Sequence, residues 1–331
     1  MSDDFYSYAQ LAAPSVLRSV QQHYDLAKLE RCKFYARGLH DNYLLESQQQ
    51  KFILRVYRNA WRTEEAIRFE LDLLRYLGER GASVSYPINT TSGASCFSIA
   101  TPIAQHFAAL FAYADGQAPG GALSVAESQL LGNAVAQIHA AGDDFSSSHT
   151  RPALDLTFLV DASIESITPF VDATYLAYLK QLQARLHQTL PQIPQGQGRY
   201  GICIGDVNPT NFHINAQQQI TVFDFDQCGF GDRAFEIGKF ISAIHLHDKK
   251  QELSQAFVEG YQQVRLLSSD ELRAIPYYEM VGVIWVMAIT ADYADLHGHK
   301  WFGQAYWERK LAILKALESQ ILEGYYGYHE N

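Results

Sequence analysis

The stretch GICIGDVNPTNFHINAQQQITVFDFDQCGFGD, residues 201–232, decides the fold of this 331-residue chain. Asp206 and Asn211 lie five residues apart in D-V-N-P-T-N, and the turn residues between them should bring both side chains to one side of a loop. Asp224 follows in TVFDFD, residues 221–226, where β-branched and aromatic residues alternate with carboxylates as in a half-buried strand. The stretch therefore predicts a loop, a short hairpin and a second loop.

These three polar side chains suit a phosphoryl-transfer site. Such a site needs oxygen ligands for Mg²⁺ and a carboxylate that orients the attacking hydroxyl and accepts its proton. Asp206 is the candidate base, and Asn211 and Asp224 are the candidate metal ligands. The alternative is that all three are ordinary turn residues, since Asp and Asn are common in loops. Two carboxylates in an apolar strand are unfavourable without a metal or a partner, which favours the site.

The stretch resembles the catalytic loop and metal loop of the aminoglycoside phosphotransferase and choline kinase family, small relatives of the protein kinases. The family pattern reads H-G-D-x-x-x-x-N, followed by I-D-F-D or I-D-W. The resemblance implies that Asp206 is the catalytic aspartate, and that Asn211 and Asp224 hold the metal. Ile204 stands where the family usually has a histidine, and Asn208 replaces a second common histidine.

The resemblance covers almost the whole chain and implies an α+β, two-lobed protein-kinase-like fold. Residues 1–114 would form a strand-rich N-terminal nucleotide-binding lobe, and residues 115–331 a mainly helical C-terminal lobe for catalysis and acceptor binding. The sequence gives a clear helix signal early in the second lobe. Ser124 and Glu127 form a capping box before an apolar repeat that ends at Gly142.

The N-terminal part contains the expected phosphate loop. Residues 8–30 predict a helix, and residues 33–57 read as strand, turn, strand, turn, strand. The turn ARGLHDN, residues 36–42, has a single glycine and matches no G-x-G-x-x-G signature. It resembles the family's looser phosphate loop, in which Gly38 would allow the turn and Asn42 would lie just before the second strand.

Arg55 and Glu70 form a candidate pair for orienting the nucleotide. Arg55 lies in the strand pattern KFILRVYR, and Glu70 falls within the apolar helical stripe of Ile67, Leu71 and Leu74. A carboxylate on a core-facing helix surface needs a cation, which an inward Arg55 would supply. The pair resembles the strand lysine and helix glutamate that hold the nucleotide phosphates in kinases. A plain structural ion pair is the alternative.

Phe111 and Tyr113 lie in the extended run 107–116, which ends in a turn signal. In the family this run is the hinge between the lobes, where backbone groups contact adenine. The resemblance therefore implies that both residues belong to the nucleotide site. The alternative is a buried strand that leaves its sheet.

The segment GDRAFEIGKFISAI, residues 231–244, begins at the end of the catalytic stretch and predicts a strand followed by a helix. Asp232 and Glu236 are at i and i+4, and the family has acidic residues in corresponding places, where they brace the metal loop. His139 matches a position where the family often has a histidine, for which we expect a packing role.

Acidic residues on the helical segment 248–325 leave two interpretations open. Glu279, Asp292 and Asp295 could select an amino or quaternary ammonium substrate, but a solvated helix face is the simpler interpretation. The H-x-H motif at 297–299 has metal-like spacing without a visible third ligand, and it predicts a surface loop.

Composition limits the possible partners and the compartment. With 26 basic and 36 acidic residues the net charge is −10, which argues against a nucleic-acid or anionic-membrane surface. The four cysteines contain no C-x-x-C pair and suit a reducing cytoplasm. The N-terminus lacks the apolar core of a signal peptide. The most apolar stretch, 280–291, is too short to span a bilayer and predicts a buried helix.

The resemblance and the motif together predict transfer of the γ-phosphate of ATP, with Mg²⁺, to a hydroxyl of a small molecule such as an aminoglycoside, choline, ethanolamine or homoserine. Seven residues separate Asp224 from Asp232, too few for a protein-kinase activation segment, which favours a small-molecule acceptor. A bacterial serine/threonine kinase of the same family stays open. So does an inactive nucleotide-binding scaffold, because of Ile204, Arg55 and the glycine-poor loop. The oligomeric state and the acceptor stay open too.

Overall fold

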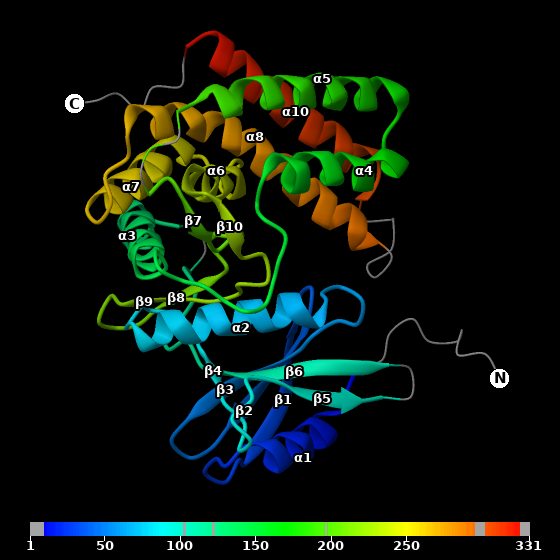
Figure 1. Ribbon diagram of the computed structural model, residues 1–331, viewed down its shortest axis with the longest axis vertical. Helices are drawn as coiled ribbons and strands as arrows, with labels where there is room; N and C mark the ends of the chain where they lie inside the picture. The colour runs from blue at the N-terminus through cyan, green and yellow to red at the C-terminus, as the bar shows by residue number, and fades with distance from the viewer. Residues whose placement is uncertain are drawn as a thin grey trace, which may run out of the picture. The chain divides into compact units, whose positions relative to one another are not determined.

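The computed structural model describes residues 10–101, 104–120, 123–194, 196, 198–294 and 302–324. The chain divides into two compact units. Unit 1 comprises Met1–Asp115, Phe145–Arg151 and Thr221–Phe223, and unit 2 comprises Gly116–Asp144, Pro152–Ile220 and Asp224–Asn331. The predicted α+β architecture is confirmed, because unit 1 contains a large sheet and unit 2 is mainly helical (Figure 1).

Unit 1 is built on a six-stranded antiparallel sheet. Its order is β1-β2-β3-β6-β4, and β5 also pairs with β6. The strands are β1 Arg31–Arg37, β2 Asp41–Glu46, β3 Lys51–Val56, β4 Pro87–Ile88, β5 Phe97–Ala100 and β6 Gln105–Ala112. The predicted meander of three strands is confirmed as β1 to β3.

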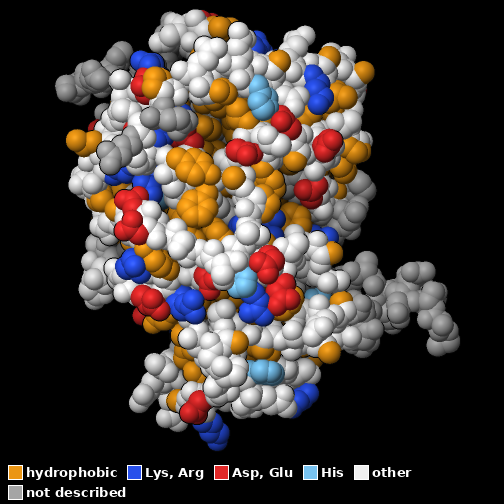
Figure 2. Space-filling model, in the orientation of Figure 1, with side chains coloured by type: hydrophobic (Ala, Val, Ile, Leu, Met, Phe, Trp, Pro, Cys, Tyr) orange, Lys and Arg blue, Asp and Glu red, His pale blue; other side chains and the backbone are white. Residues whose placement is uncertain are grey.

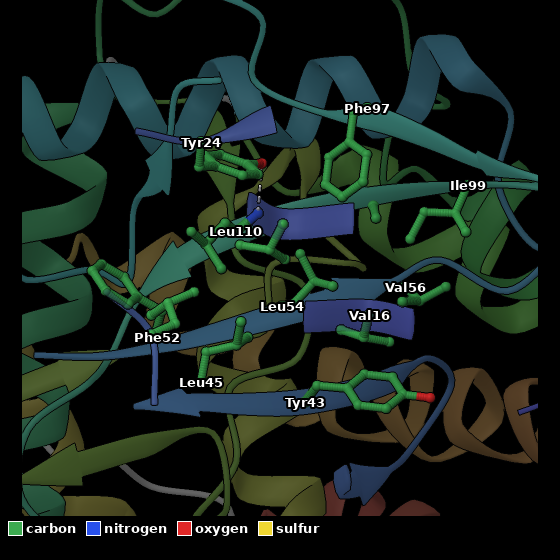
Figure 3. Close-up of a cluster of buried hydrophobic side chains, with 13 residues drawn as sticks. Val16, Tyr24, Tyr43, Leu45, Phe52, Leu54, Val56, Phe97, Ile99 and Leu110 are labelled. Atoms are coloured by element: carbon green, nitrogen blue, oxygen red, sulfur yellow. Dashed lines mark hydrogen bonds between the residues drawn. The ribbon is translucent and has the colours of Figure 1, made fainter. Parts of the chain in front are cut away.

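Helix α1, Ala13–His23, packs against one face of this sheet. Figure 3 shows Val16 of α1 among buried side chains of the strands, and the hydroxyl of Tyr24 accepting a hydrogen bond of 3.3 Å from the backbone N–H of Leu110. The other labelled members of this cluster are Tyr43, Leu45, Phe52, Leu54, Val56, Phe97 and Ile99. The predicted helix over 8–30 is wrong after His23, because Tyr24 takes an extended backbone and its ring is buried in the cluster.

Helix α2, Glu64–Glu79, covers the opposite face of the sheet (Figure 1). The hydroxyl of Thr63 accepts a hydrogen bond from the N–H of Ala66, which caps the helix as its sequence predicts. Successive side chains of a strand point to opposite faces, so Leu54 lies in the cluster with α1 while its neighbour Arg55 points to the α2 face. This alternation is what directs Arg55 toward α2.

Unit 2 consists mainly of helices. They are α3 Val125–Ala141, α4 Ser163–Ile167, α5 Ala173–Thr189, α6 Arg233–Ala243, α7 Lys250–Gln262, α8 Ser269–Asp292 and α10 Gln304–Leu322, with a π-helical turn at Thr157–Ala162 and 3-10 turns at Thr168–Phe170 and Leu190–Gln192. The predicted capping box of α3 is confirmed, since the N–H of Glu127 donates to the hydroxyl of Ser124 and the N–H of Ser124 donates to the carboxylate of Glu127.

Two short strand pairs complete the fold. β7 Tyr200–Cys203 pairs antiparallel with β10 Gly229–Asp232, and β8 Phe212–Ile214 pairs with β9 Ile220–Val222. The predicted hairpin is therefore confirmed. The predicted strand over 221–226 is wrong beyond Val222, because Asp224 has φ +66°, in the left-handed region that a strand does not adopt.

Helix α8 is long and apolar enough to cross a membrane by length and composition alone. However, 78% of its most apolar 18-residue segment is buried inside the structure, as in the core helix of a globular protein. The predicted buried helix is thus confirmed, and it is longer than the apolar stretch 280–291 because a capping box starts it at Ser268.

The sequence favours a solvated helix face for the acidic residues Glu279, Asp292 and Asp295. That interpretation is wrong for Glu279, whose side chain is fully buried and accepts a hydrogen bond of 2.6 Å from the ammonium of Lys250. Asp292 is exposed. Asp295 and the motif at 297–299 lie outside the described residues. On the face shown in Figure 2, acidic and basic side chains are interspersed rather than segregated.

Candidate active site

The loop between β7 and β8 is held at its start by a buried carboxylate of α6. Glu236 is fully buried and accepts hydrogen bonds from the backbone N–H groups of Ile204 and Gly205, the latter at 2.9 Å. The oxygen that accepts from Ile204 also lies 3.3 Å from Nε2 of His139. With one backbone N–H group bound to each of its oxygens, Glu236 braces the loop that carries Asp206.

His139 is neutral in this arrangement. Burial lowers the pKa of its imidazole, and both oxygens of Glu236 act as acceptors for backbone N–H groups, so Nε2 donates to Glu236. Nδ1 then accepts from the hydroxyl of Tyr261 at 2.7 Å. His139, Cys203 and Glu236 lie close enough to bind a metal, but burial raises the pKa of the Cys203 thiol well above its usual range and both Glu236 oxygens already accept hydrogen bonds. We assign the group a structural role.

Asp206 is bound on both of its carboxylate oxygens. The ammonium of Lys239 lies 2.7 Å from Oδ1, and the amide Nδ2 of Asn211 donates to Oδ2 at 3.0 Å and to the backbone carbonyl of Asp206 at 3.0 Å. The Asp206 side chain is 29% exposed, so it remains accessible from solvent. A carboxylate has about four lone-pair sites, which leaves acceptor capacity for a hydroxyl. The structure thus brings Asp206 and Asn211 together, as their spacing predicts.

The side chain of Asn208 makes hydrogen bonds within this loop. Its Nδ2 donates to the carbonyl of Asp206 at 3.1 Å, and its Oδ1 accepts from the N–H of Thr210 at 2.9 Å. Because Nδ2 of Asn211 is used on Asp206, Oδ1 of Asn211 is the atom suited to a metal ion. Asn208 and Glu236 together fix the loop, whereas Ile204 contributes a fully buried apolar side chain.

Asp224 lies just after β9, in unit 2 with Asp206 and Asn211. It is half-buried, while the next two residues, Phe225 and Asp226, are buried. A non-glycine residue with a positive φ is uncommon, and such backbone conformations cluster at functional sites. Its carboxylate and the Oδ1 of Asn211 are oxygen donors of the kind that Mg²⁺ prefers.

Asp232 joins the start of α6 to the rest of unit 2. One oxygen accepts from Nε of Arg199 at 2.5 Å and from the hydroxyl of Tyr278 at 3.0 Å, and the other accepts from the N–H of Ala234. Burial, followed by the neighbouring Asp232, raises the pKa of Tyr278 and keeps its hydroxyl protonated. Asp232 therefore fixes the helix that supplies Glu236.

Lys239 is the residue in contact with Asp206 that the sequence did not single out. It lies on α6 between apolar residues, and only 2% of its side chain is exposed. The available signal was its position three residues after Glu236, which places both on one side of the helix. A charge among buried apolar positions needs a partner, but the spacing alone does not identify Asp206 as that partner.

In unit 1 the structure brings Arg55 and Glu70 together. Nη1 of Arg55 lies 2.9 Å from Oε1 of Glu70, and the hydroxyl of Tyr57 donates to Oε2 at 3.2 Å. Glu70 is almost fully buried, so loss of its cation would leave an uncompensated charge. The guanidinium of Arg55 also lies 5.4 Å from the ring centroid of Phe111 on β6.

The remaining predicted residues of unit 1 are spread along the same sheet. Gly38 lies in the turn between β1 and β2, and its N–H donates to the carbonyl of His40 at 3.1 Å. Asn42 is the second residue of β2 rather than a residue before it, and it lies opposite Arg55 in the strand register. Tyr113 follows β6, with the ammonium of Lys51 5.4 Å from its ring centroid.

Comparisons with known proteins agree with this architecture. Residues 31–275 match the family described as the phosphotransferase enzyme family. An uncharacterized protein of Synechocystis is 34% identical over 320 residues, which cover 94% of this chain and 87% of that protein. A homoserine kinase of Beijerinckia indica is 25% identical over 281 residues, which cover 81% of this chain and 82% of that enzyme.

Among solved structures, the amicoumacin kinase hAmiN, in complex with AMP-PNP and Ca²⁺, has a TM-score of 0.75 at 21% identity. The match covers 94% of this chain and 93% of that chain. The likeness confirms the protein-kinase-like fold that the family resemblance implies. The family match over residues 31–275, together with the relative in Synechocystis, shows that this chain belongs to the phosphotransferase enzyme family.

Proposed function

We propose that the protein is a kinase that transfers the γ-phosphate of ATP, with Mg²⁺, to a hydroxyl group of a small molecule. The observation that carries the proposal is the carboxylate of Asp206, which is held by Lys239 on one oxygen and by Asn211 on the other and is still partly exposed. A positioned carboxylate with spare lone pairs is what a phosphoryl-transfer site needs to orient an attacking hydroxyl.

Each residue has one role in the proposed reaction. The acceptor hydroxyl donates its proton to Asp206, its oxygen forms the new bond to the γ-phosphorus, and the bond to the bridging oxygen of ADP breaks. Oδ1 of Asn211 and the carboxylate of Asp224 would hold Mg²⁺. When bound, the metal neutralises charge on the phosphate oxygens. No protein atom forms a covalent bond to the phosphoryl group.

Residues of unit 1 would position the nucleotide. Arg55, oriented by Glu70, presents a planar guanidinium, which matches the geometry of phosphate oxygens well. We further propose the β1–β2 turn with Gly38 and Asn42 as the phosphate loop. The backbone from Phe111 to Tyr113 would contact adenine. In this scheme residues 1–114 bind the nucleotide and residues 115–331 supply catalysis and acceptor binding, in a cytoplasmic setting that the cysteine content favours.

We propose Lys310 on α10 as the residue that would bind a carboxylate of the acceptor. Burial, followed by the nearby charges of Lys239 and Arg309, lowers the pKa of Lys310 on α10. Within the described residues Lys310 has no ion pair with a carboxylate, and its ammonium lies 5.7 Å from the ring centroid of Tyr306. An ammonium group without a carboxylate partner would attract an anionic acceptor and disfavour a cationic one such as choline. Homoserine, the substrate in the name of the Beijerinckia relative, meets this requirement.

A matched pair of acceptors tests this function and its acceptor class. Homoserine and 3-aminopropan-1-ol share the amine and the hydroxyl and differ in the carboxylate. We expect kcat/KM for homoserine to exceed that for the amino alcohol roughly 10- to 100-fold, since a hydrogen bond to a charged group contributes about 1.5–3 kcal/mol. The assay measures Mg²⁺-dependent ADP release, with the phosphorylated product identified by ³¹P NMR.

Two lysines of α10 provide the variant and its control. Lys310→Met should reduce the preference for homoserine, whereas Lys315→Met, on the exposed side of the same helix, should leave it unchanged. Equal kcat/KM for the two acceptors in the wild type would contradict the acceptor class. Binding of Mg²⁺-ATP without transfer to any small alcohol would favour the nucleotide-binding scaffold.

A further inference from the structure

One side of α6 contacts three consecutive residues of the loop between β7 and β8. Glu236 accepts from the N–H groups of Ile204 and Gly205, and Lys239, one turn further along, contacts the side chain of Asp206. The first contact fixes the loop backbone, and the second fixes the carboxylate. The same helix therefore sets both the position of Asp206 and the orientation of its side chain.

The contact between Lys239 and Asp206 is buried at one end and open at the other. Lys239 is 2% exposed and Asp206 is 29% exposed. A buried ammonium requires an anion, and Asp206 supplies it at 2.7 Å. Without Lys239, the Asp206 carboxylate would keep only the Asn211 contact on its other oxygen, and it could rotate away from an incoming hydroxyl.

We propose that Lys239 is a positioning residue for the phosphotransfer, which fixes the carboxylate of Asp206 so that its remaining lone pairs face the acceptor hydroxyl. This inference rests on the proposed function. The proton still passes from the acceptor to Asp206, while Lys239 donates a hydrogen bond to Oδ1 and keeps its own protons. Misplacement of a catalytic group by about 1 Å can cost on the order of 100-fold in rate.

A double-mutant cycle separates this role from that of a plain structural ion pair. We expect Lys239→Met to lower kcat on the order of 100-fold with KM for ATP unchanged. In the Asp206→Asn background the same change should cost little more, because residues that act through one another are not additive. Lys250→Met is the matched control, since it removes another lysine contact to a carboxylate of unit 2, the buried Glu279, and should leave kcat unchanged.

Chemical rescue supplies a second measurement, because added amines would not restore kcat if Lys239 had only a structural role. Lys239→Ala should regain part of its kcat when ethylammonium or propylammonium is added, whereas Asp206→Asn should not. Circular dichroism and thermal unfolding confirm that each variant is folded. A folded Lys239→Met enzyme with wild-type kcat, beside an inactive Asp206→Asn enzyme, would overturn the inference and leave the proposed function standing. A wild-type enzyme that transfers no phosphate to any acceptor would overturn both.

Discussion

Asp206→Asn should lower kcat about 10²- to 10⁴-fold, the usual contribution of a positioned general base, while Mg²⁺-ATP binds as tightly as to the wild type. The amide has the same shape as the carboxylate, but it offers one acceptor oxygen and cannot take the proton of the acceptor hydroxyl. Steady-state release of ADP with homoserine as acceptor measures kcat, and calorimetric titration measures nucleotide binding.

Asp172→Asn is the matched control for this change. Asp172 caps α5 by accepting a hydrogen bond of 2.7 Å from the N–H of Tyr175, and Asn caps helices about as well as Asp. The control should keep the wild-type kcat. If Asp206→Asn also kept the wild-type kcat, the assignment of Asp206 as the base would be wrong.

Gly205→Ala should strongly destabilise unit 2. Gly205 has φ +80°, and a Cβ atom there would lie 2.1 Å from the backbone carbonyl oxygen of Gln227, far inside van der Waals contact. The left-handed conformation costs about 1–2 kcal/mol for a residue with a side chain, and overpacking adds typically 1–3 kcal/mol. We expect the free energy of unfolding of unit 2, measured with urea, to fall by the sum of these two terms. We also expect kcat to fall, because Asp206 is the next residue.

Gly198→Ala separates the two contributions. Gly198 has a similar φ of +74°, but a Cβ atom there would meet only the side chain of Arg265 at 3.8 Å, an ordinary contact. This variant should therefore lose only the conformational part, about 1–2 kcal/mol. Equal losses for the two variants would show that the backbone approach of Gln227 to Gly205 is not a tight constraint.

The parts of the site that the sequence predicts are those that depend on local patterns. Asp206 and Asn211 are five residues apart, and one turn brings them together. Arg55 and Glu70 each lie in a periodic element, where alternation of the strand and the apolar stripe of the helix direct both side chains inward. The short hairpin and the capping box of α3 are local in the same sense, and the structure contains both.

The parts that the sequence does not predict depend on contacts between distant segments. Lys239 contacts a residue 33 positions away, and the pattern of α6 shows only that one side is buried. Tyr24 ends α1 early because its ring enters a cluster in which its hydroxyl binds Leu110, 86 residues later. Asp224 leaves the strand pattern through a backbone conformation that residue alternation does not encode.

Mg²⁺-dependent stabilisation by ATP, compared between the wild type and Asp224→Asn, tests the central claim most directly. Asn tolerates a positive φ, so the variant removes the charge without adding backbone strain. ATP at about 100 times its dissociation constant should add about 2.7 kcal/mol to wild-type stability. We expect thermal unfolding of the wild type to show this gain in stability with Mg²⁺ and to lose it when a chelator is added. Asp224→Asn should need a much higher ATP concentration to reach the same stabilisation. Equal stabilisation of both proteins at every ATP concentration, or none in the wild type, would contradict a metal-nucleotide site at Asp224.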